Sequence, residues 1–205
     1  MFSAVLKKTN KILHCLLFFA SASLLLSVPL HAAEGNTASY TLTKQYGSVL
    51  FRVMHQEYLN MVGRFDDFSG TLYMDFDNMA NSRLDAAVNM ASLNMADSDV
   101  VETLVNSSIW FNASLYPQAT FRTREVIQTG NNAIDFVGDL NFVGVSMPWT
   151  LHVILHGGSD GELTGSTIGM TARGRINRTD FGLDQYMNLA DENVSIEVNV
   201  KFNRD

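Results

Sequence analysis

Apolar and polar residues alternate with a period of two along most of the chain after residue 48, and this pattern constrains the fold more than any other feature. Val49, Phe51, Val53 and His55, for example, share one face of an expected strand. Alternation between turn residues is typical of strands with one buried face. The pattern recurs at 49–55, 71–76, 84–90, 134–142, 151–156, 168–177 and 194–202, with weaker strands near 40–43 and 119–126.

Only the stretch 97–117 departs from this pattern at length, and it predicts a helix. Asp97, Ser98 or Asp99 is a suitable N-cap residue. The apolar residues that follow then fall on one helical stripe, formed by Val100, Val101, Leu104 and Val105. The sequence therefore predicts an all-β fold, a single antiparallel barrel of eight strands with one inserted helix. A closed barrel leaves no exposed sheet edge.

Residues 1–33 have the order of a secretory signal peptide. A basic start is followed by an apolar run at 12–30, and Ala32 and Ala33 then offer small residues for cleavage. The run is long enough to span a bilayer, so a retained membrane anchor is the alternative. We expect cleavage, and divide the chain into a signal peptide at 1–33 and a barrel domain at 34–205.

Removal of the signal would change the charge and the cysteine content of the protein. The single cysteine, Cys15, would be lost, so no disulfide is expected. The formal charge would move from −7 to −10, because three of the 14 basic residues and none of the 21 acidic ones precede residue 34. Such an acidic surface argues against nucleic acid and anionic lipid headgroups as partners. We expect no stable membrane insertion of the mature chain, and whether it forms a homodimer stays open.

A search for catalytic and metal-binding patterns finds little. Gly157–Gly161 matches G-x-S-x-G, but it joins two expected strands, whereas a nucleophile elbow joins a strand to a helix. His152 and His156 share one strand face at a spacing of about 13 Å, too far apart for one metal ion. We therefore expect no catalytic residue, metal or cofactor.

Alternation alone does not say which face points inward. A barrel in an outer membrane turns its apolar face towards lipid, and a soluble barrel does the reverse. The length of the stretch 97–117 and the shortness of several strands favour the soluble barrel. The polar face should then lie outside, and it carries Arg122, Arg124, Arg173 and Arg175.

The expected interior offers one ionisable group among apolar ones. His55 continues the apolar face of its strand, so it is a candidate for recognising the polar head of a ligand, with a structural histidine as the alternative. Arg64 and Arg178 lie near strand ends, where they would reach a head group or pair with aspartates such as Asp67 or Asp180. The many aromatic and methionine residues can line a cavity or fill a core, and by themselves they favour a filled core.

Four blocks of residues, in this order and spacing, resemble a known family. They are 48–55 with 63–70; 110–111 with 116–117 and 120–121; 138–140 with 144–148; and 178–183 with 191–194. With these blocks the chain resembles the YceI-like, polyisoprenoid-binding proteins of the bacterial periplasm, over about 40–202. The resemblance implies a lipocalin-like barrel with an apolar tunnel for a prenyl chain. The chain departs from the usual pattern at Thr103, Asn112 and Val143.

These observations predict a periplasmic protein that binds a long isoprenoid lipid, such as a polyprenyl chain, a quinone or a precursor, for transport, storage or sequestration. The alternatives are a filled structural or stress-response barrel without a ligand, and an enzyme that acts on such a lipid. The candidate ligand-binding residues are Phe51, Val53, His55, Phe65, Trp110, Phe111, Phe121, Phe136, Phe142 and Met170.

Overall fold

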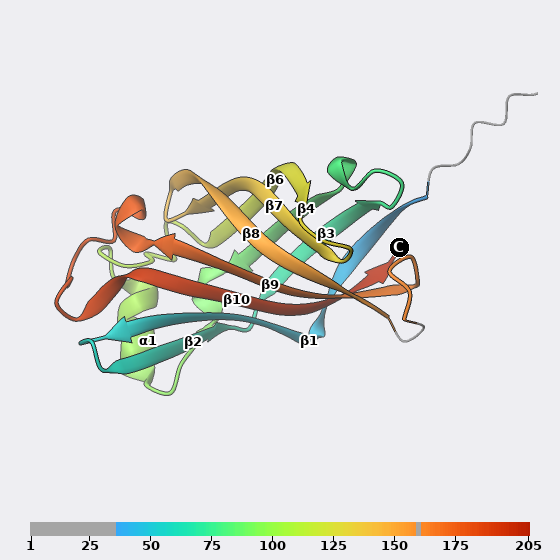
Figure 1. Cartoon of the computed structure of the whole chain (residues 1–205). Coiled ribbons are helices and arrows are strands. Elements are labelled where there is room, and N and C mark those ends of the chain that lie inside the picture. The colour runs from blue at the N-terminus through green and yellow to red at the C-terminus, as the bar shows by residue number, and fades with distance from the viewer. Residues whose placement is uncertain (1–35, 159–160) are drawn as a thin grey trace, which may run out of the picture. The chain divides into compact units, whose positions relative to one another are not determined.

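The computed structural model of the protein describes residues 36–158 and 161–205 (Figure 1). The predicted signal peptide at 1–33 lies outside these residues. The strands are β1 (Thr37–His55), β2 (Leu59–Phe65), β3 (Phe68–Asp75), β4 (Arg83–Asn89), β5 (Leu93–Asn94), β6 (Gln118–Gln128), β7 (Ala133–Phe142), β8 (Val145–Gly157), β9 (Thr167–Asn177) and β10 (Ala190–Arg204). The helices are η1 (Met79–Asn81), η2 (Met90–Ser92), α1 (Ser98–Asn106) and η3 (Arg178–Phe181).

Eight of the strands in the described residues form a closed antiparallel barrel, as predicted. Their order is β10-β9-β8-β7-β6-β4-β3-β1, and pairing of β1 with β10 closes the ring. Strands β2 and β5 extend the sheet beyond β1 without joining the ring. Closure satisfies the backbone groups that an open sheet would leave at its two edges.

Strand β1 closes the barrel. It pairs with β10 along both of its halves, and the register shifts between Thr43 and Ser48. On its other side the first half of β1, Thr37–Thr41, pairs with β3, and the second half, Val49–His55, pairs with β2. The sequence predicts two separate segments here, whereas the structure joins them into one bent strand of 19 residues.

Strand β2 was not predicted, and the reason is Gly63. This glycine interrupts the apolar face that Met61 and Phe65 would otherwise continue. A Cβ atom at Gly63 would lie 2.2 Å from a ring carbon of Phe51. The missing side chain therefore makes room for an aromatic ring on the neighbouring strand.

The predicted inward and outward faces are confirmed. Apolar residues of the predicted faces, such as Leu151, Val153 and Leu155 of β8, are buried in the barrel. The arginines predicted to lie outside are exposed, and three of them pair with carboxylates on neighbouring strands. Their nitrogen–oxygen distances are 3.3 Å for Arg122–Asp85, 2.5 Å for Arg124–Asp139 and 4.0 Å for Arg173–Glu197. Charge thus covers the face that a lipid-facing barrel would make apolar.

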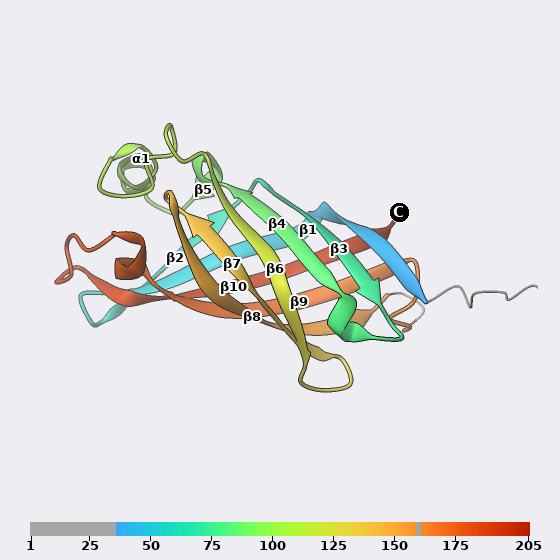
Figure 2. The ribbon, with the colours of Figure 1, turned by 90° about the horizontal axis from the view of Figure 1, so that it is seen from above.

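Helix α1 begins where the sequence predicts. The Asp97 side chain accepts hydrogen bonds from the backbone N–H groups of Asp99 and Val100, which makes it the N-cap. Figures 1 and 2 both show α1 at one end of the barrel, together with the β1–β2 turn and the connection from β9 to β10. Within the described residues no helix is both long and apolar enough to cross a bilayer.

The turn between β7 and β8 has a backbone that does not suit its first residue. Phe142 pairs with Val145, so Val143 and Gly144 form a two-residue hairpin turn. Their φ angles are 44° and 80°. Two positive φ angles define the type I′ turn, in which Asn-Gly is preferred and a β-branched residue is strained.

We therefore expect Val143→Asn to raise the free energy of unfolding by about 1 kcal/mol, because asparagine tolerates the left-handed backbone. Urea denaturation measures the change. Val137→Asn, on β7 with extended backbone, is the control and should lower stability. A Val143→Asn protein no more stable than the parent would contradict the assignment of strain to this turn.

Candidate functional site

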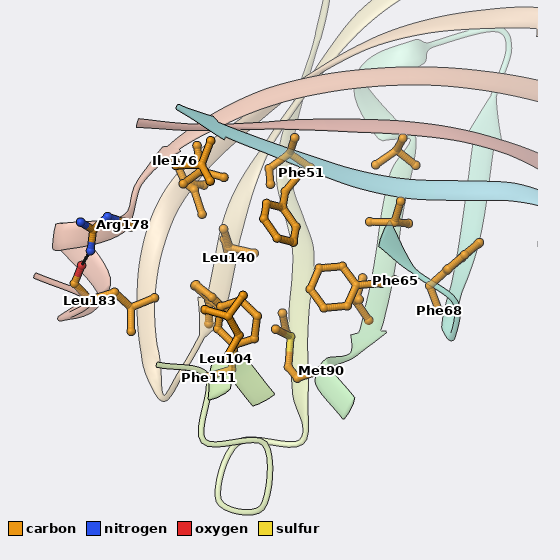
Figure 3. A pocket seen from close by; sticks show the side chains of 18 of the residues that line it. Phe51, Phe65, Phe68, Met90, Leu104, Phe111, Leu140, Ile176, Arg178 and Leu183 are labelled. Carbon is orange, nitrogen blue, oxygen red and sulfur yellow. Dashed lines mark hydrogen bonds between the residues drawn. The ribbon is translucent and has the colours of Figure 1, made fainter. Parts of the chain in front are cut away.

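The barrel encloses a cavity of about 740 Å³. Its wall is contributed by all eight barrel strands, by β2 and by α1, and most of its side chains are apolar. Figure 3 shows three rings gathered around it, Phe51 from β1, Phe65 from β2 and Phe111 from the segment after α1. The filled core favoured by the residue types alone is therefore wrong for this part of the barrel.

Hollow and filled regions occupy opposite ends of the barrel. Fully buried side chains that do not line the cavity lie at the start of β1, β7 and β9 and at the end of β3 and β8, far from α1 along antiparallel strands. They are Tyr40, Leu72, Met74, Ile134, Phe136, Leu155 and Ile168. The barrel is thus packed solid at one end, as a close-packed core requires, and hollow at the α1 end.

Nine of the ten predicted ligand-binding residues line the cavity, and Phe136 does not. The nine are Phe51, Val53, His55, Phe65, Trp110, Phe111, Phe121, Phe142 and Met170. Phe136 shares the inward face of β7 with Phe142, but it lies at the packed end and is fully buried. Its placement excludes it from the wall of the cavity, and a ligand-binding role for the other nine stays a prediction.

A row of aromatic rings builds one side of the cavity. Successive ring centroids are 6.0 Å apart for Phe51–Phe65, 6.3 Å for Phe65–Phe111, 5.6 Å for Phe111–Phe142 and 5.4 Å for Phe142–Phe181. The last two pairs meet edge to face, which is the favourable geometry for aromatic rings. The rings connect β1, β2, β7 and η3 to the segment after α1, and all of them except Phe181 line the cavity.

The cavity opens at the α1 end of the barrel. Ile109 and Tyr186 both line it, and they are 41% and 51% exposed. Tyr186 stacks on Trp110, with ring centroids 6.1 Å apart and planes at 14°. This pair joins the segment after α1 to the connection between η3 and β10. We call these two segments, together with α1 and the β1–β2 turn, the mouth; it comprises residues 56–62, 98–117 and 179–192.

Arg178 is buried at the mouth, where it is 3% exposed. Its guanidinium donates hydrogen bonds to four backbone carbonyls and contacts the sulfur of Met187. The carbonyls belong to Leu183, Gln185 (2.9 Å), Ala190 (2.8 Å) and Asp191 (3.0 Å). Its face lies 5.7 Å from the centre of the Trp110 ring. Figure 3 shows the bond to Leu183.

The predicted aspartate side-chain partner of Arg178 is wrong, because its hydrogen bonds go to four backbone carbonyls and to the sulfur of Met187. Burial lowers the pKa of the guanidinium, and the charges of Asp184, Asp191 and Glu192 act in the opposite direction. Arginine stays charged even so. The predicted pairing of Arg64 with a nearby aspartate is confirmed, and the partner is Asp66. The Nε atom of Arg64 lies 2.6 Å from a carboxylate oxygen of Asp66.

His55 lines the cavity near its mouth. It stands opposite Ala190 of β10, and the next residue, Gln56, donates its backbone N–H to Leu189 at 2.9 Å. None of the hydrogen bonds found among the described residues involves the His55 ring. The ring therefore has donor and acceptor capacity to offer to a polar group in the cavity.

Several lining residues were missed because their segments show no alternation. Helix α1 contributes Asp99 and Thr103, and its C-cap residue Ser107 also lines the cavity; Thr103 is one of the departures from the family pattern. The connection before β10 contributes Leu183 and Leu189. In the sequence, only the apolar character of these two leucines within a polar stretch indicated that they face the interior.

The remaining candidates for chemistry lie away from the cavity. The G-x-S-x-G match begins at Gly157, the last residue of β8, and the chain then leads to β9. The match therefore lies between two strands, as predicted; Ser159 and Asp160 lie outside the described residues. His152 and His156 both lie on β8; the first contacts Asp135 at 2.8 Å and the second Thr171 at 3.1 Å. No group of three or more metal-binding side chains occurs within residues 36–158 and 161–205.

Comparisons with known proteins agree with this architecture. Residues 40–203 match the family model of the YceI-like domain. Protein YceI of Escherichia coli is 32% identical over 188 residues, which cover 91% of this chain and 95% of that protein. The crystal structure of BcnA from Burkholderia cenocepacia has a TM-score of 0.71 at 21% identity, covering 78% of this chain and 98% of that one. A polyisoprenoid binding domain from Saccharophagus degradans has a TM-score of 0.61 at 14% identity, covering 82% and 99%.

Proposed function

The chain belongs to the YceI-like family, and from its half-hollow barrel we propose that it binds an isoprenoid lipid, with the hydrocarbon chain in the cavity and the polar head at the mouth. The observation that carries the proposal is the cavity itself. Its volume of about 740 Å³ lies in the range of ligand-binding pockets. Its wall offers apolar side chains almost throughout, and the ionisable groups His55, Asp99 and Arg178 belong to segments that meet at the mouth.

The physical reason for such a protein is the insolubility of the lipid in water. Burial of hydrocarbon contributes roughly 0.8 kcal/mol per CH₂ before the costs of association. A few isoprene units in the cavity therefore suffice for useful affinity. A water-filled apolar cavity would be unfavourable, so we expect the barrel to be occupied in the cell.

We propose binding, and not catalysis, as the role of the protein. The polar side chains of the cavity wall at the mouth include the imidazole of His55, the hydroxyls of Thr103, Ser107 and Tyr186, and the carboxylate of Asp99. These groups are suited to hold a polar head by hydrogen bonds. With export by the predicted signal peptide, the protein would carry, store or sequester its lipid in the periplasm. A solved barrel of the same fold is described as a polyisoprenoid binding domain, a likeness that supports the fold alone at 14% identity.

Native mass spectrometry of the protein purified from its own host tests this function. We expect a bound species whose extracted mass corresponds to a prenyl lipid. Added prenyl quinone should bind in a 1:1 ratio to protein from which the lipid has been removed. Empty protein that also takes up no added prenyl lipid would overturn the proposal.

A further inference from the structure

The mouth of the cavity carries negative charge and no free positive charge. Its three segments are 56–62, 98–117 and 179–192, and together they contain no lysine or arginine. They contain seven carboxylates, from Glu57, Asp99, Glu102, Asp180, Asp184, Asp191 and Glu192. All seven residues are exposed. A head group that enters the mouth therefore meets a field of one sign.

Arg178, the only cation that the described residues place in the wall of the cavity, is not available to a ligand. Its Nε and both terminal nitrogens donate to backbone carbonyls, and the Trp110 ring lies against its face. Asp184, Asp191 and Glu192 are near enough to act on its charge. To bind a phosphate, Arg178 would have to give up bonds that hold the connection before β10.

The arginines on the flanking strands do not compensate. Arg64 pairs with Asp66, and Arg52 and Arg175 are exposed residues outside the wall of the cavity. Phosphate recognition by proteins normally uses arginine or lysine donors, or the N-terminus of a helix. At the N-terminus of α1 the Asp97 carboxylate already accepts from the first free N–H groups.

We propose that the mouth selects prenyl lipids by the charge of the head group, accepting an uncharged polar head such as an alcohol or a quinone and rejecting a phosphate or diphosphate. This inference rests on the proposed function and names the lipid class within it. His55, Thr103 and Ser107 would supply hydrogen bonds to the uncharged head. The prenyl chain alone contributes equally to both classes, so the head group decides between them.

A matched pair of lipids tests this selection: geranylgeraniol and geranylgeranyl monophosphate, which differ only in the phosphate. Dissociation constants are measured by displacement of a bound fluorescent prenyl probe at low and high salt. We expect the alcohol to bind at least about tenfold more tightly at about 0.01 M ionic strength. The gap should shrink at about 1 M, because the Debye length falls from about 30 Å to 3 Å.

Charge variants locate the effect at the mouth. Glu102→Gln/Asp184→Asn removes two mouth charges, and Asp184→Asn keeps the side-chain oxygen that accepts from Gln185 at 3.0 Å. We expect tighter binding of the phosphate by about threefold or more at low salt. The control Asp77→Asn/Glu125→Gln changes the net charge equally on residues outside the mouth and the cavity wall, and should leave the affinity for the phosphate unchanged.

The possible results separate the two proposals. Equal affinity for the two lipids at low salt, or tighter binding of the phosphate, overturns charge selection and leaves isoprenoid binding intact. An equal gain of phosphate affinity in both double variants also overturns it, because the effect would then come from net charge. Failure of both lipids to bind at either salt concentration overturns the proposed function as well.

Discussion

Replacement of Arg178 by alanine is expected to lower the free energy of unfolding by about 3–5 kcal/mol, the cost of breaking a buried charged network. The guanidinium satisfies four backbone carbonyls, two in the connection before β10 and two at the start of β10, and alanine would leave these acceptors without their donor. Lysine offers three donors from one nitrogen and cannot reproduce this arrangement. Chemical denaturation of the parent and of Arg178→Ala measures the loss.

Arg175→Ala is the matched control for this prediction. Arg175 lies three residues earlier in the chain, is exposed and does not line the cavity. Its loss should change stability by less than about 0.5 kcal/mol, as for surface substitutions in general. If Arg178→Ala and Arg175→Ala lowered the free energy of unfolding by the same small amount, Arg178 would not be the residue that organises the mouth. Circular dichroism at low temperature checks that Arg178→Ala still folds before its stability is compared with that of the parent.

Filling the hollow end of the barrel is expected to abolish most lipid binding without loss of stability. Val53 and Val198 line the cavity, and Val53→Phe/Val198→Phe would place two rings in it. Displacement of one isoprene unit removes about 2–4 kcal/mol, which corresponds to roughly 30- to 1,000-fold in Kd. Titration with a prenyl quinone measures the affinity, and urea denaturation measures the stability.

The stability result decides between a hollow and a packed interior. Two larger side chains in a packed core usually cost about 1–3 kcal/mol each, whereas a real cavity accepts them. Val62→Phe is the control, since Val62 lies on β2 beside the cavity-lining Met61 but is 38% exposed and outside the wall. A large loss of stability in the double variant, with unchanged affinity, would contradict the cavity as the binding site.

The packed end and the hollow end of the barrel have different roles, one in stability and the other in the proposed ligand binding. The packed end supplies the buried apolar area that stabilises the fold, through residues such as Tyr40, Leu72 and Phe136. The hollow end can then exchange its contents without exposing the whole core. This division explains why the Arg178 network, which stabilises the mouth, lies at the hollow end, where apolar packing is incomplete.

Local patterns in the sequence were enough to predict the barrel, its inward faces and its helix. The period of two is a property of the extended backbone, so residues such as Phe51 and Val53 could be assigned to one shared face without a structure. The length of 97–117 and the short strands then indicated that this face points inward. The helix start at Asp97 was equally local, because an N-cap bonds to the next residues in the chain. The resemblance to the YceI-like family was also present in the sequence alone, and the comparisons confirmed it.

Only the tertiary structure decided which part of the interior is hollow and what Arg178 does. Phe136 and Phe142 occupy the same face of β7, yet one is packed and the other lines the cavity, because free volume depends on side chains from all eight strands together. The four carbonyls that hold Arg178 come from residues 183–191, and no spacing in the sequence indicates that their oxygens converge. Strand β2 was hidden for a similar reason, since Gly63 is explained only by the Phe51 ring that covers it.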